Sequence, residues 1–362
     1  KALRYNTTGQ YNTSVGRYSL LNNTTGGNNT ALGVNTLINN TTGSRNTAVG
    51  MESLYYNNVG NNNSAFGQQA LINNTTGGNN TAVGLNSLLS NVVGNRNNAF
   101  GVYALRNNTT NNNNAFGYFA LTSNTTGTNN SAFGHYALRN NTIGINSAAF
   151  GYRALRLNVT GNRNTAVGKS AMENNLAGSN NSAFGYSALL NNTTDNNTAC
   201  GFKALFTNTI GSSNSAFGMY ALLLNTTGGG NTAVGLSALQ NNTIGTVNTA
   251  VGKDALKLNT TGSNNNAFGF YSLLNNTIGT SNNAFGSSAL RFNTIGTNNN
   301  AFGYRALIFN TTGADNIAIG TDALYANTIG ASNIAIGKNA LKDNTLGLRN
   351  LAIGQQALNG NT

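Results

Sequence analysis

The feature that most constrains this chain is a 17-residue repeat that runs from one end of the sequence to the other. We number each unit so that its last residue, a glycine, is position 17. This glycine recurs every 17 residues, except for two spacings of 16 that end at Gly117 and Gly201. A fixed period of this kind indicates a solenoid, in which each repeat packs on its neighbours. We therefore expect one continuous array over residues 1–362, and no second domain.

Apolar residues recur at fixed positions of the unit, which argues against a disordered Asn-rich tract although only 7% of residues are charged. Position 4 is Leu in nearly every unit, and position 16 is mostly Phe, Val or Ile. We interpret both as core residues, each in a short strand of roughly four to six residues bounded by turns. Position 9, which is often Thr or Ile, is expected at the edge of the core.

These features predict an all-β fold, a parallel β-solenoid (β-roll) of about 21 coils with a 17-residue repeat. Coils stacked at the strand spacing of about 4.8 Å would form a rod on the order of 100 Å long. Neither end of the sequence shows an atypical capping unit, so we expect a segment of a longer fibre, or ends that dock on neighbouring chains.

Glycine at two positions of the unit predicts turns. Position 10 is Gly in most units, and the two 16-residue units place Asn111 and Asp195 there, residues that tolerate positive φ. Position 17 is always Gly, which predicts positive φ or a close backbone approach. The turn glycines selected at position 17 are Gly50, Gly84, Gly134, Gly185, Gly235, Gly286 and Gly337.

Asparagine recurs at positions 7 and 13, which predicts amide ladders along the stack. The representatives at position 7 are Asn40, Asn74, Asn141, Asn192, Asn242, Asn276, Asn310 and Asn344. Many of these asparagines also belong to Asn-x-Thr sequences, which are glycosylation acceptors if the chain passes through a secretory route that attaches glycans. The possible glycosylation sites are Asn23, Asn74, Asn242 and Asn276.

Alanine fills position 15 in all units but the first, and it is common at position 3. Each alanine lies beside a large apolar residue, so on a strand it points to the opposite face. A face of alanines packed closely against another chain would explain them, and this favours a homo-oligomer, with three chains as the expected number. The alternative is that small residues suit a narrow single-chain coil.

Short pieces such as Asn46–Gly50 (NTAVG), Asn181–Gly185 (NSAFG) and Asn333–Gly337 (NIAIG) resemble the YadA-like head repeats of trimeric autotransporter adhesins. The resemblance covers the whole array, with one motif in each unit. It implies a trimer of left-handed parallel β-rolls displayed on a cell surface for adhesion. This sequence departs from that family in its longer unit, whose extra residues fall in the Asn-Thr-Thr-Gly turn, and in lacking the family's neck, stalk and anchor.

Catalytic, metal-binding and cofactor-binding motifs are not expected. His135 is the single histidine, and the seven acidic residues do not recur at one position, which excludes the calcium-binding nonapeptide roll. Cys200 occupies position 16 and is interpreted as a small buried residue. The basic residues are scattered, so no nucleic-acid partner is expected. No apolar run is long enough to insert into a membrane.

The predicted function is therefore structural: an extracellular or cell-surface filament or adhesin shaft, or a virion fibre, that assembles with copies of itself. One alternative is an ice-binding solenoid that uses the threonines of position 8. Another is a phage or viral fibre that binds glycans or receptors. The variable positions 1, 2, 5, 11 and 12 should face solvent, and their Tyr and Arg residues offer a contact surface. These are Tyr103, Tyr118, Tyr136, Tyr152, Tyr186, Tyr220, Tyr271, Tyr304, Arg106, Arg139, Arg153 and Arg305.

Overall fold

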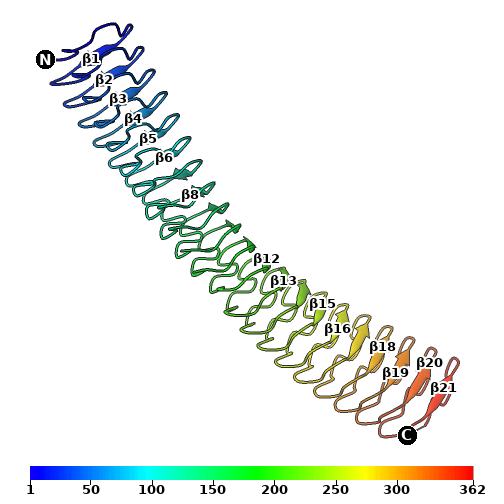
Figure 1. Ribbon diagram of the computed structural model, residues 1–362. Coiled ribbons are helices and arrows are strands. Elements are labelled where there is room, and N and C mark those ends of the chain that lie inside the picture. The colour runs from blue at the N-terminus through cyan, green and yellow to red at the C-terminus, as the bar shows by residue number, and fades with distance from the viewer. Residues whose placement is uncertain (362) are drawn as a thin grey trace. The chain divides into compact units, whose positions relative to one another are not determined.

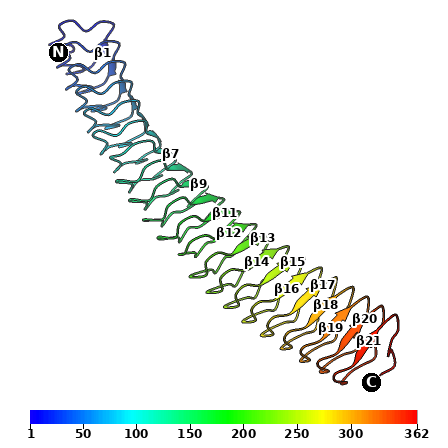
Figure 2. The ribbon, with the colours of Figure 1, turned by 45° about the vertical axis from the view of Figure 1, so that its right-hand side comes forward.

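The computed structural model describes residues 1–361, in which every repeat forms one coil of a parallel β-solenoid (Figures 1 and 2). The chain divides into two compact units, Lys1–Asn180 and Asn181–Thr362, which we call the first and second stacks and describe separately. The described residues contain no helix, and each coil has one strand of three residues at positions 14 to 16. The remainder of each coil consists of turns and bends.

The strands lie side by side along each stack. The first stack contains β1 (Thr13–Val15), β2 (Thr30–Leu32), β3 (Thr47–Val49), β4 (Ser64–Phe66), β5 (Thr81–Val83), β6 (Asn98–Phe100), β7 (Asn114–Phe116), β8 (Ser131–Phe133), β9 (Ala148–Phe150) and β10 (Thr165–Val167). The second contains β11 (Ser182–Phe184), β12 (Thr198–Cys200), β13 (Ser215–Phe217), β14 (Thr232–Val234), β15 (Thr249–Val251), β16 (Asn266–Phe268), β17 (Asn283–Phe285), β18 (Asn300–Phe302), β19 (Ile317–Ile319), β20 (Ile334–Ile336) and β21 (Leu351–Ile353).

Successive strands within each stack are parallel and in register, so equivalent positions of neighbouring coils face each other. In β17 and β18, for example, Ala284 pairs with Ala301. The same register continues outside the strands: the N–H of Leu290, at position 4, donates to the carbonyl of Ala306 in the next coil at 3.0 Å. The prediction of a parallel solenoid with a 17-residue repeat is confirmed.

The core consists of alanine at positions 15 and 3 and leucine at position 4, which are almost all fully buried. The prediction that position 16 lies in the core is wrong. Phe184 and Phe217 are each 43% exposed, and Cys200 between them is also exposed. Side chains alternate along a strand, so burying position 15 turns positions 14 and 16 outward. Position 9 also faces solvent, since Ile278 is 52% exposed.

The buried alanines also correct the argument for an oligomer. Ala284 and Ala289, at positions 15 and 3, have no exposed surface in a single chain. They cannot therefore form a face that packs on another chain. This burial agrees with the alternative that small residues suit a narrow coil. The methyl groups are fully enclosed by the close-packed interior of a single chain.

The backbone explains why positions 3 and 4 form a turn instead of the second strand that we predicted. Leucine at position 4 has positive φ, for example 51° at Leu290, and so do the residues at positions 2 and 12. The expectation of positive φ at position 10 is wrong, since Asn111 and Asp195 have ordinary φ. In the two short coils the positive φ belongs to Asn112 and Asn196, at position 12.

Candidate functional surfaces

The asparagines of position 7 form the predicted ladder inside the coil. The Nδ2 of Asn276 donates to the Oδ1 of Asn259 in the preceding coil at 2.8 Å and to the carbonyl of Gly279 in its own turn at 2.9 Å. Its Oδ1 accepts from the Nδ2 of Asn293 at 2.8 Å. Asn40, Asn74, Asn141, Asn242, Asn310 and Asn344 repeat these contacts, and the Oδ1 of Asn192 accepts from Asn208.

The asparagines of position 13 form a second ladder of a different kind. The Oδ1 of Asn282 accepts from the backbone N–H of Asn299 in the next coil at 3.1 Å. Its Nδ2 donates to the carbonyl of Gly296, at position 10 of the next coil, at 2.8 Å. Both ladders therefore satisfy buried turn groups and join neighbouring coils.

Burial of position 7 bears on the possible glycosylation sites. Asn23, Asn74, Asn242 and Asn276 have no exposed surface. The selection of Asn242 and Asn276 is also wrong at the level of sequence, because each is followed by Thr-Ile and not by x-Thr. The nitrogen that would carry a glycan already donates two hydrogen bonds, as in Asn242, whose partners are Asn225 and Gly245. A glycan on any of these nitrogens would occupy space inside the coil, so the folded structure argues against modification there.

The glycines of position 17 have both properties that the sequence predicted. Their φ values lie between 122° and 141°. A Cβ atom on Gly286 would lie 2.4 Å from the carbonyl oxygen of Gly303 in the next coil. Gly50, Gly84, Gly134, Gly185, Gly235 and Gly337 have the same positive φ and the same close neighbour.

The outer face of the strands carries a row of apolar side chains at position 16, which we call the apolar row. In the first stack, the rings of Phe100, Phe116, Phe133 and Phe150 stack nearly parallel, with successive centroids 4.6, 4.6 and 4.8 Å apart. The second stack repeats this arrangement in Phe268, Phe285 and Phe302. The row follows the coil register, so apolar groups adjoin one another along the face.

A second surface combines aromatic and basic side chains at positions 1, 2 and 5 of the first stack. Arg106 lies over the ring of Tyr103, with Cζ 5.2 Å from the centroid. Arg139 lies over Phe119 and Tyr136 at 5.3 and 5.4 Å. Tyr118 packs edge-on against Phe119 at 4.4 Å. We call these six residues the aromatic–basic patch: Tyr103, Arg106, Tyr118, Phe119, Tyr136 and Arg139.

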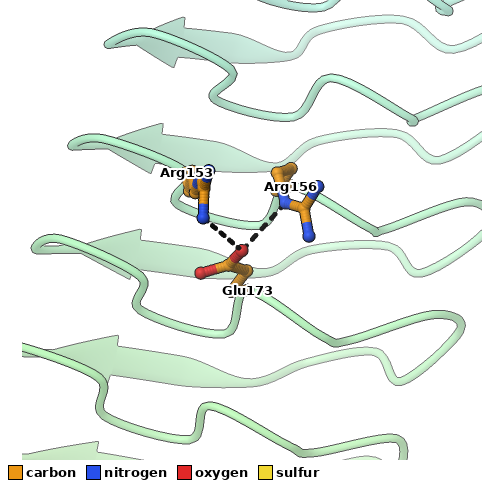
Figure 3. Close-up of polar contacts among 3 residues, drawn as sticks. All are labelled: Arg153, Arg156 and Glu173. Carbon is orange, nitrogen blue, oxygen red and sulfur yellow. Dashed lines mark hydrogen bonds and ion pairs between the residues drawn. The ribbon is translucent and has the colours of Figure 1, made fainter.

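On the coils that follow the patch, two arginines lie close to an acidic residue and are not free to extend the positive surface (Figure 3). Glu173 is 8% exposed, and its Oε1 lies 2.8 Å from the Nε of Arg156 and 3.8 Å from the Nη1 of Arg153. In the second stack, Asp322 forms two hydrogen bonds of 2.8 Å with Arg305, and these raise the pKa of the Arg305 guanidinium. Both carboxylates neutralise arginines that would otherwise add to the positive surface.

A groove of about 980 Å³ runs along another face of the first stack, between the side chains of positions 6 and 8. The amides of Asn22 and Asn39 lie on one side and are joined by a hydrogen bond of 3.2 Å. The full lining is Asn22, Asn39, Thr41, Tyr56, Asn58, Asn73, Thr75, Ser90 and Val92. No sequence motif predicted this groove. Its two sides are formed by positions 6 and 8, which lie directly before and after the buried asparagine of position 7.

The threonines of position 8, which the ice-binding alternative would use, are engaged within the stack. The hydroxyl of Thr277 donates to the carbonyl of Thr294 in the next coil at 3.0 Å, and Thr294 does the same to Thr311. Their hydroxyl hydrogens are therefore used within the stack, and only the hydroxyl oxygens are left to bond to ice. The ice-binding alternative stays a prediction.

No group of three or more metal-ligating side chains occurs among residues 1–361, and His135 lies on the surface near Tyr118. The same residues include no helix that could cross a membrane. No protein-family model matches the sequence, and no curated protein matches it either.

Proposed function

We propose that the chain is a structural segment of an extracellular or cell-surface filament or adhesin shaft, in which copies pack side by side. The observation that carries this proposal is the apolar row. Single exposed apolar residues are ordinary, but a contiguous apolar strip on an exposed sheet face is typical of an interaction surface. The alanines are buried, so the proposal of lateral packing depends on the exposed side chains of position 16 instead.

The stacked coils themselves suit a mechanical role. Neighbouring coils are joined by backbone hydrogen bonds, two asparagine ladders and position 8 threonine bonds, all repeated at the same positions. A trimer of left-handed coils, as the resemblance to YadA-like head repeats implies, is one arrangement in which three apolar rows would face a common axis. The location outside the cell is part of the same proposal.

Multi-angle light scattering of the purified chain tests lateral packing. We expect a mass that is a multiple of 37.5 kDa, with three copies as the expected number. Replacing Phe133 and Phe150 with Ser removes apolar surface from the row without touching the buried core, and should shift the mass toward 37.5 kDa. The matched control replaces Ile278 and Ile295, which are exposed at position 9, with Ser and should leave the mass unchanged.

A mass of 37.5 kDa for the unmodified chain at every concentration would defeat the proposal. It would also be defeated if the position 9 control dissociated the assembly as fully as the position 16 variant. The circular dichroism spectrum of each variant should match that of the unmodified chain, because all four side chains lie outside the core.

A further inference from the structure

We propose that the aromatic–basic patch binds a linear anionic polysaccharide, whose carboxylate or sulfate groups are held by Arg106 and Arg139. This inference goes beyond the structural role and does not depend on lateral packing. Arg106 is exposed and Arg139 is half-exposed, and neither lies on the apolar row.

The charge distribution is the first argument. No acidic residue lies between Glu52 and Glu173, whereas seven basic residues do. The ion pairs found among residues 1–361 involve neither Arg106 nor Arg139. Their guanidinium N–H groups therefore remain available for an anion, and the planar guanidinium matches the two oxygens of a carboxylate or sulfate.

The spacing is the second argument. Arg106 and Arg139 both occupy position 5, two coils apart. At the strand spacing this separation is about 10 Å along the stack. The ligand should therefore present anionic groups at regular intervals along an extended chain, as polymers with a charged sugar in each repeating unit do. Tyr118 of the patch is 39% exposed and offers ring surface to the C–H groups of a sugar.

The packing of the rings favours a polysaccharide over a single-stranded nucleic acid. Bases bind such surfaces by stacking on free aromatic faces. Here Arg106 covers a face of Tyr103, and Arg139 lies over both Phe119 and Tyr136. The surface that remains consists of guanidinium groups, which suit charged oxygens, and the single ring of Tyr118, which can pack on sugar C–H groups.

Glu173 defines one end of the binding surface. It neutralises Arg156 and lies near Arg153, on the coils that follow Arg139. Replacing it with Gln keeps the shape of the side chain and removes the charge. Because the proposed polymer runs along the stack, Glu173→Gln should release these two arginines and strengthen binding.

The test measures binding of sodium polygalacturonate and dextran sulfate by biolayer interferometry at low salt, with uncharged dextran for comparison. The double variant Arg106→Gln, Arg139→Gln should lose about tenfold or more in affinity for the charged polymers. The matched control is Arg45→Asn, Arg96→Asn, which removes the same charge from exposed position 12 in the same stack. Its affinity should fall by less than about twofold, and Glu173→Gln should bind more tightly than the unmodified chain.

The proposal fails if the two double variants lose affinity equally, since the binding would then reflect net charge alone. It also fails if uncharged dextran binds as tightly as the charged polymers. Tighter binding of an oligothymidylate that is lost in Arg106→Gln, Arg139→Gln would assign the patch to nucleic acid. The light-scattering mass should be the same in all these variants, which separates this result from a failure of lateral packing.

Discussion

At the residue scale, the unusual feature is a leucine with left-handed backbone angles in coil after coil. Leu290 has φ of 51°, and Met172, the single replacement at position 4, has φ of 48°. Left-handed angles are costly for residues branched at Cβ. The sequence contains Val and Ile at position 16 but never at position 4. This difference could have indicated, from the sequence alone, that position 4 does not lie in a strand.

We predict that Leu290→Ile lowers the stability of the second stack by about 1–3 kcal/mol more than Leu290→Met does. Both replacements keep a large apolar side chain, but only isoleucine is branched at Cβ. The measurement is the urea midpoint of the far-ultraviolet circular dichroism signal for the two variants. Equal midpoints would show that the backbone angle at position 4 carries no steric demand.

At the element scale, the unit of stability is the turn of positions 7 to 10 with its buried asparagine. A Cβ on Gly245 would lie 2.3 Å from the carbonyl oxygen of Gly262 and 2.4 Å from the Oδ1 of Asn242. Position 10 is therefore glycine because the asparagine ladder and the next coil fill the space that a Cβ atom would need. The backbone φ at this position does not require glycine. The two short coils use the carbonyl of Thr110 or Thr194 in place of the glycine carbonyl.

We predict that Asn276→Ala destabilises the second stack by about 2–4 kcal/mol, because the buried Oδ1 of Asn259 loses its hydrogen-bond donor. The Nδ2 of Asn293 and the carbonyl of Gly279 each lose one of their two side-chain hydrogen bonds. The adjacent Asn275→Ala, at half-exposed position 6, should change stability by less than about 0.5 kcal/mol. Hydrogen exchange of the amides in the neighbouring coils checks both values. Similar protection in the two variants would contradict a structural role for the ladder.

At the scale of the whole molecule, the coils carry two surfaces of different chemistry, the apolar row of both stacks and the aromatic–basic patch of the first stack. The apolar row lies on the outer strand face, and the charge is unevenly divided: residues 1–180 contain eleven basic and two acidic residues, and the rest contain eight and five. One surface favours packing of like copies, and the other favours an anionic partner.

These two surfaces should respond to salt in opposite ways. We predict that about 1 M sodium sulfate preserves or strengthens the self-association, because sulfate favours apolar burial. The same salt should abolish binding of polygalacturonate, because it screens exposed charges within a few ångström. Light scattering and interferometry at matched salt concentrations measure the two effects. Dissociation of the assembly by salt would indicate that charges hold it together.

The sequence by itself determined the period, the parallel stacking, the glycine of position 17 and the asparagine ladder, because each follows from one residue type repeated at one place in every coil. The tertiary structure decided which of two adjacent positions faces inward. In a three-residue strand either the alanine of position 15 or its larger neighbour at position 16 could be buried, since side-chain alternation permits both registers. The narrow coil has room only for alanine, so the larger side chains lie outside, and the surface available to partners is the one that the sequence pattern had placed in the core.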